Sequence, residues 1–246
     1  AQAVLETILD QNPESWSHPG LLHLYVHLME MSPTPEKALK AGDVLRELVP
    51  DAGHLIHMPT HIDVQCGHYQ DVLHWNLKAT QVDRKALDRM GVYSLYTGYR
   101  IHNYHFAVYG AMFLGQYEPA MKMAQELAKV TPEELLRVES PPFATFFESY
   151  FALKVHVMVR FGRWQEIIEE PLPEDQLLWA NLTATLHYAK GVAHAALGEV
   201  QNAETEQAKF LGARDVMPKD RRLHNVLCVD QLSVAEAMLE GEIEYR

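Results

Sequence analysis

The stretch GHLIHMPTHIDVQCGHYQDVLHWNLKAT, residues 53–80, contains the features on which predictions of both fold and site rest. Its first nine residues include three histidines, His54, His57 and His61, spaced three and four apart. This spacing places their side chains on one face of a helix. The segment Gly67-His68-Tyr69 then marks the break between this helix and the next one.

Composition places the chain among soluble globular proteins. It has 246 residues, of which 48% are hydrophobic and 22% charged, and this length builds a core without disulfide bonds. The net charge of −12 argues against nucleic acid as a partner. No apolar run approaches the roughly 20 residues that span a bilayer, so we expect no membrane partner. Two distant cysteines, Cys66 and Cys228, favour a reducing compartment and predict a cytoplasmic protein.

A short signal recurs along the chain where one helical pattern ends and another begins. It consists of glycine, any residue, and usually an aromatic residue, followed three positions later by a small or aliphatic residue. The signal begins at Gly67, Gly115 and Gly162, and more loosely at Gly198 and Gly241. Apolar residues between these points follow a helical period, and no segment alternates as a strand does. The sequence therefore predicts an all-α protein built of helical hairpins.

This pattern resembles the tetratricopeptide repeat (TPR), a helix-turn-helix unit of 34 residues. Residues 184–211 carry the clearest single unit, with small residues at the consensus spacing. The resemblance implies a TPR-like α-α superhelix, a solenoid of antiparallel helix pairs, as one domain over residues 1–246. Gly241 should open a second helix, yet only five residues follow it. Because a repeat without its partner helix leaves an apolar face uncovered, we expect this chain to be a fragment of a longer one.

Histidine occupies most of the positions that the TPR resemblance assigns to the concave groove. In that family the second, fifth and ninth residues of each first helix face the groove. For repeats that begin at Pro19, Gly53 and Ile101, seven of these nine positions are histidine: His23, His27, His54, His57, His61, His102 and His105. The spacing supports this independently, because His23 and His57 are 34 positions apart, as are His27 and His61.

Histidines gathered from neighbouring helices favour a metal site. Adjacent helix axes lie about 8–10 Å apart, so imidazoles from two helices can reach one ion at about 2.0–2.1 Å. Seven imidazoles in one concavity should be largely neutral, since like charges disfavour protonation, and neutral imidazole is the ligand form. Donors of this kind predict zinc, copper, iron or nickel rather than magnesium or calcium.

Two further residues are candidates for catalysis. Glu30 shares a helix face with His23 and His27, where it is a candidate carboxylate ligand, partner of a ligand or general base. Tyr109 takes the remaining polar groove position and is a candidate hydrogen-bond donor to a substrate. Pro59 interrupts the helix that carries three of the histidines and should kink it.

Four segments extend the resemblance to a group of TPR-like proteins from bacteria, fungi and algae. They are HPGLLHLYVHLMEMSPTPEKAL, PDAGHLIHMPTHIDVQCGHY, YRIHNYHFAVYGAMFLGQ and PEELLRVESPP. This resemblance implies no particular activity.

Three functions remain open from the sequence. The first is a metal-binding TPR-like protein that acts as a hydrolytic or oxidative metalloenzyme on a small molecule or peptide in the groove. The alternative is a TPR scaffold that binds a peptide or protein partner without metal, although grooves for acidic peptides would favour lysine and arginine at these positions. Metal storage or sensing without catalysis is a third use of the same site. The sequence contains no HExxH motif and no phosphate-binding loop.

Overall fold

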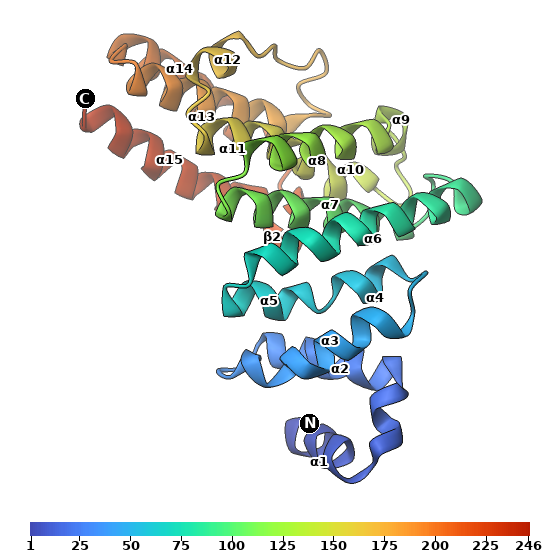
Figure 1. Cartoon of the computed structure of the whole chain (residues 1–246). Helices are drawn as coiled ribbons and strands as arrows, with labels where there is room; N and C mark the ends of the chain where they lie inside the picture. The colour runs from blue at the N-terminus through green and yellow to red at the C-terminus, as the bar shows by residue number, and fades with distance from the viewer. The chain divides into compact units, whose positions relative to one another are not determined.

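The computed structural model describes residues 1–246 and is almost entirely helical (Figure 1). The chain divides into two compact units, Ala1–Met123 and Ala124–Arg246, and helix α8 (Tyr117–Val130) contains the boundary. The prediction of an all-α protein is confirmed at this level. None of the helices combines the length and apolarity that crossing a membrane requires.

The first unit contains seven α-helices and two short 3₁₀ helices before α8. They are α1 (Gln2–Gln11), η1 (Pro13–Ser17), α2 (Pro19–Glu30), η2 (Pro35–Ala38), α3 (Leu39–Leu48), α4 (Gly53–His57), α5 (Thr60–Cys66), α6 (Tyr69–Met90) and α7 (Tyr96–Phe113). Leu22, Val26 and Met29 of α2 pack with Leu45 of α3 and Ile62 of α5 in the core of its amino-terminal half. Helices α6 and α7 lie side by side (Figure 1).

The second unit contains the remaining helices and one very small sheet. Its elements are α9 (Glu133–Leu136), α10 (Phe143–Phe147), η3 (Glu148–Ala152), α11 (Leu153–Arg160), α12 (Trp164–Glu169), α13 (Ala180–Ala196), α14 (Val200–Asp215), β1 (Arg222–Leu223), β2 (Val226–Leu227) and α15 (Cys228–Glu244). Strands β1 and β2 pair antiparallel, and their two-residue length explains why no alternating pattern reveals them. Helix α13 packs against α12, α14 and α15 (Figure 1).

Four of the five predicted turn signals are confirmed as links between successive helices. Gly67, Gly115, Gly162 and Gly198 have φ values of 78°, 68°, 65° and 81°, in the left-handed region that favours glycine. Gly241 differs, because it lies inside α15. The prediction that Gly241 opens another helix was therefore wrong, since an isolated glycine is also tolerated within a helix.

Two of the three predicted starts of histidine-bearing helices agree with the structure. Helix α2 begins at Pro19, and the Nδ1 atom of His18 accepts a hydrogen bond from the backbone N–H of Leu21 at 3.1 Å, which caps the helix. Helix α4 begins at Gly53, as predicted. Helix α7 begins at Tyr96, five residues before the predicted start at Ile101.

Pro59 divides the predicted histidine helix into α4 and α5. Met58 and Pro59 keep right-handed helical dihedrals, but the N–H of His61 bonds to the carbonyl of Met58 at 3.2 Å, which tightens the turn. The carbonyl of His57 accepts instead from the hydroxyl of Thr60 at 2.6 Å. The hydroxyl of Thr60 therefore gives the carbonyl of His57 a partner in place of the N–H of His61, which bonds to Met58 instead.

Candidate metal centre

Six of the seven predicted metal-binding histidines form two triads. The outer triad is His23, His27 and His54, and the inner triad is His57, His61 and His102. Within each triad, the three candidate ligand atoms lie within 4.8 Å of one another. His105 belongs to neither triad, and its ring centroid is 5.9 Å from that of His102.

Four helices supply the six side chains. Helix α2 carries His23 and His27, α4 carries His54 and His57, α5 carries His61, and α7 carries His102. The two triads meet on α4, where the rings of His54 and His57 are stacked with their centroids 6.2 Å apart. All six histidines lie in the first unit, so the arrangement is complete within one compact body.

The inner triad brings three ring nitrogens unusually close together. The Nε2 atom of His61 lies 2.9 Å from Nε2 of His57 and 3.3 Å from Nε2 of His102. Two nitrogens bound to a common ion at about 2.0–2.1 Å, with angles of about 90–110°, lie about 2.8–3.4 Å apart. The observed separations fall within this range, so the three nitrogens could hold one metal ion.

The hydrogen bonds around His57 determine which of its nitrogens carries a proton. Asn76 donates its Nδ2 group to the hydroxyl of Thr60 at 3.0 Å and to the carbonyl of Val72 at 2.8 Å. Its Oδ1 atom is therefore the acceptor that faces Nδ1 of His57 at 2.7 Å. His57 donates from Nδ1, which leaves the lone pair of Nε2 directed at His61.

Glu30 fixes His61 in the same way. Its Oε1 atom lies 2.6 Å from Nδ1 of His61, and a carboxylate accepts from that nitrogen. Of the three roles predicted for Glu30, this contact corresponds to the partner that orients a metal ligand and raises its basicity. Two lone pairs, on Nε2 of His57 and of His61, then face each other at 2.9 Å, and only a cation or an extra proton between them relieves the repulsion.

Burial lowers the pKa of several of these imidazole rings. The pKa of His57 lies well below its usual value, chiefly because the ring is buried and secondly because His61 is close. Burial also lowers the pKa of His54 to about 4, with further lowering by His23 and His27. The pKa of His23 is lowered by burial and by His27. These three imidazoles are neutral at pH 7, which agrees with the expectation from sequence.

An apolar ring covers the inner triad. The ring centroid of Phe106 lies 4.8 Å from that of His57, 4.4 Å from that of His61 and 4.8 Å from that of His102. This contact shields the three imidazoles from water on that side, and a low local dielectric strengthens charge interactions. His61 keeps 11% of its side chain exposed, so solvent reaches the triad there.

The tyrosine predicted for the site lies elsewhere on α7. Tyr109 packs against Phe113 at a centroid distance of 4.6 Å, and burial raises its pKa. Tyr99 is the tyrosine whose ring meets a triad histidine, 4.4 Å from His54. The predicted hydrogen bond from Tyr109 to a substrate remains a prediction.

Sequence reasoning missed two residues that shape the inner triad, although each left a signal. Phe106 follows His102 by four positions, so the two share a face of α7. Asn76 lies on the buried face of α6, four residues after Val72. A polar residue on an otherwise buried face indicates a specific hydrogen-bond partner.

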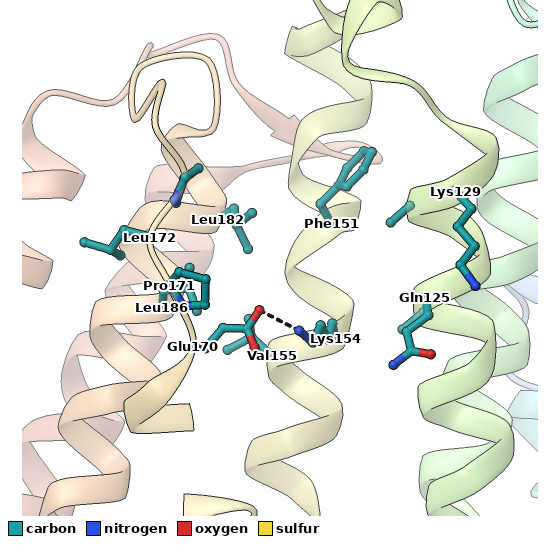
Figure 2. A pocket seen from close by; sticks show the side chains of 13 residues that line it. Gln125, Lys129, Phe151, Lys154, Val155, Glu170, Pro171, Leu172, Leu182 and Leu186 are labelled. Atoms are coloured by element: carbon teal, nitrogen blue, oxygen red, sulfur yellow. Dashed lines mark hydrogen bonds and ion pairs between the residues drawn. The ribbon is translucent and has the colours of Figure 1, made fainter. Parts of the chain in front are cut away.

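Two other places on the chain have features of a site. Asp63, His68 and Asp71 also lie within metal-binding distance, but Asp63 is already paired with Arg46, and the other two side chains are exposed. A cavity of about 490 Å³ lies in the second unit, lined largely by apolar side chains such as Phe151, Leu182 and Leu186 (Figure 2). Two of its charged side chains, Lys154 and Glu170, pair with each other at 2.5 Å. The cavity therefore presents no cluster of unpaired reactive groups from these two residues.

No family model, curated protein or solved structure matches this chain.

Proposed function

We propose that this chain is a metal-binding protein in which His57, His61 and His102 hold one transition-metal ion. The observation that carries the proposal is the convergence of three Nε2 atoms, with that of His61 lying 2.9 Å from that of His57 and 3.3 Å from that of His102. Asn76 and Glu30 hold the two rings in these orientations from behind. Such outer partners are typical of histidine metal ligands in proteins.

We further propose that the helical hairpins follow a TPR-like superhelix. The left-handed turn glycines and the 34-residue offset between His23 and His57 support this arrangement. In such a repeat, equivalent positions of successive first helices face one concave surface, which accounts for a histidine centre built from α2, α4, α5 and α7.

Three imidazole ligands would leave the charge of the ion uncompensated and a coordination position free, as in catalytic sites. The identity of the ion decides between two chemistries on a small molecule or peptide. Zinc in such a site lowers the pKa of bound water and serves hydrolysis, whereas copper or iron serves oxidation. Glu30, which bonds His61 at 2.6 Å, supports either chemistry by holding that ligand in place.

Elemental analysis of protein purified without a histidine tag tests the metal site. We expect about one tightly bound transition-metal ion per chain in the wild type and its loss in a His57→Ala, His61→Ala double variant, because two of the three proposed ligands are absent. The control is a His68→Ala, His74→Ala variant, which removes two exposed histidines of the same unit.

The control also tests the alternative group at Asp63. Unchanged metal content in the His57→Ala, His61→Ala variant would contradict the proposal, and loss of metal in the control would place the ion near His68 instead. Wild-type protein that neither contains nor binds metal would leave the peptide-binding scaffold as the function.

A Glu30→Gln variant tests the orienting carboxylate. Glutamine keeps the length of the side chain but removes the charge that strengthens its bond to His61, so we expect metal affinity to fall at least about 10-fold. Competition with a metal chelator measures this change. A Glu47→Gln variant removes an exposed carboxylate of α3 and should leave the affinity unchanged. Equal affinities in the two variants would rule out the orienting role.

A further inference from the structure

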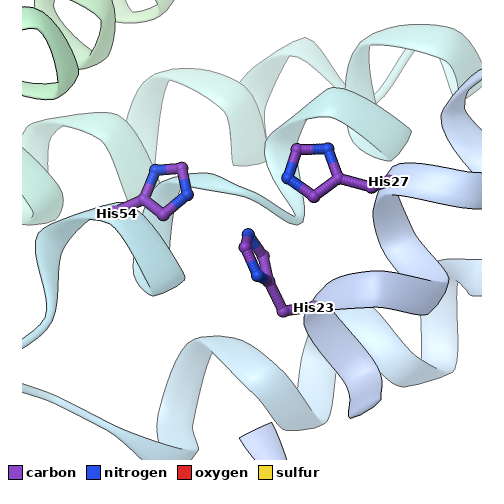
Figure 3. Close-up of side chains that lie close together, drawn as sticks. All are labelled: His23, His27 and His54. Carbon is purple, nitrogen blue, oxygen red and sulfur yellow. The ribbon is translucent and has the colours of Figure 1, made fainter. Parts of the chain in front are cut away.

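The outer triad has the geometry of a separate ligand set. The ring centroids of His23 and His27 are 4.6 Å apart, those of His23 and His54 are 5.1 Å apart, and both pairs meet edge to face. Figure 3 shows the His23 ring projecting from α2 toward the space between His27 and His54. Helices α2 and α4 thus bring three imidazoles to a common point.

Two buried nitrogens of this triad have no hydrogen-bond partner. They are Nε2 of His23 and Nδ1 of His54. Buried polar atoms in native proteins almost always have partners, so an atom without one indicates an unseen water or ion. Imidazole nitrogens from three residues suit a transition-metal ion better than a hard cation such as magnesium.

The outer triad differs from the inner triad in its support and its exposure. Glu30 bonds a histidine of the inner triad, whereas Nε2 of His23 and Nδ1 of His54 in the outer triad have no hydrogen-bond partner. His27 is exposed, whereas His57 of the inner triad is fully buried. An ion held by the outer triad would therefore be bound less firmly and would exchange more readily with solvent.

We infer that His23, His27 and His54 form a second site for a divalent transition-metal ion, weaker than the inner site. This inference deepens the proposed function, because it places an exchangeable ion beside the tightly bound one. Successive ring contacts run from exposed His27 through His23 and His54 to buried His57, at centroid distances of 4.6, 5.1 and 6.2 Å. The outer site accordingly lies at the solvent end of a continuous row of imidazoles.

Titration of metal-free protein with Zn²⁺, in competition with a chromophoric chelator, tests the second site. We expect two ions per wild-type chain, with the second bound at least about 10-fold more weakly. A His27→Ala variant should lose the weaker binding event and retain the tighter one. His27 is exposed, so this variant should fold normally, which circular dichroism checks. The His57→Ala, His61→Ala variant should show the opposite pattern, and the His68→Ala, His74→Ala control should bind both ions.

The outcomes separate this inference from the proposed function. A single Zn²⁺ ion per wild-type chain, bound equally well by the His27→Ala variant, would overturn the outer site and leave the inner site standing. Loss of the tighter event in the His27→Ala variant would also overturn it, since the six histidines would then form one shared site. A wild-type chain that binds no Zn²⁺, Cu²⁺ or Ni²⁺ would overturn both.

Discussion

An Arg46→Met variant should lose about 3–5 kcal/mol of unfolding free energy at pH 8, because it leaves a buried carboxylate without its partner. The Nη2 atom of Arg46 lies 3.1 Å from Oδ2 of Asp63, and both side chains are only 3% exposed. This pair joins α3 to α5, the helix that carries His61. Methionine approximates the volume of the arginine stem, so the change removes mainly the charge and its hydrogen bonds.

The loss should be smaller at pH 5. Burial raises the pKa of Asp63 from 3.8 to about 6, against the opposing effect of Arg46. The pKa of Asp63 is higher in the folded state than in the unfolded state, so protonation of Asp63 stabilises the folded protein. This stabilisation is complete below about pH 4 and is lost as the pH rises through about 6. At pH 5 the carboxyl is already largely protonated in the wild type, so the pair contributes little there. Without Arg46 the pKa of Asp63 rises further, so the loss of unfolding free energy is larger at pH 8 than at pH 5.

Urea unfolding followed by circular dichroism at both pH values measures this effect. A Lys85→Met variant is the control, because Lys85 pairs with Asp51 at 3.1 Å on the surface, with 65% and 80% of the two side chains exposed. Exposed pairs contribute about 0–1 kcal/mol. A loss in the Arg46→Met variant that matches the control, or that is the same at pH 5 and pH 8, would contradict the prediction.

A Gly53→Ala variant should lose about 3 kcal/mol of unfolding free energy and bind metal more weakly at both triads. A Cβ atom on Gly53 would lie 2.0 Å from Oδ1 of Asp83 and 3.1 Å from the carbonyl oxygen of Ala79. The Asp83 carboxylate cannot withdraw easily, since Tyr96 donates to it at 2.7 Å and Asn103 at 2.6 Å.

Helix α4 must therefore move away from α6 in that variant, and α4 carries one histidine of each triad. A Gly212→Ala variant is the matched control, because nothing lies within 4 Å of a Cβ at that position inside α14. The same substitution should there stabilise the protein by up to about 1 kcal/mol, through the better helix propensity of alanine. Thermal or urea unfolding compares the two variants. Equal effects in both would show that Gly53 is not in tight contact with Asp83.

Local sequence determined the hairpins and the direction of the histidines on each helix. Gly67 and Gly198 mark turns because a left-handed residue between two helices strongly favours glycine, whatever the rest of the chain does. His57 and His61 share a face because the helical period places residues four apart together. Pro59 breaks their helix because it lacks a backbone N–H, so the kink also followed from one residue type.

Only the tertiary structure decided how the histidines divide between the two triads. The helical period fixes where a side chain points around its own helix axis, but not how neighbouring helices are rotated and spaced. His57 therefore meets His102, 45 residues away, rather than joining the triad of His54 on its own helix. Asn76, which bonds His57, comes from α6, a helix that carries none of the six triad histidines. Glu30 comes from α2, and its face of that helix followed from the sequence, but its contact with His61 did not. Their contacts depend on side-chain packing between α2, α4, α5 and α6, and a one-dimensional pattern does not contain that information.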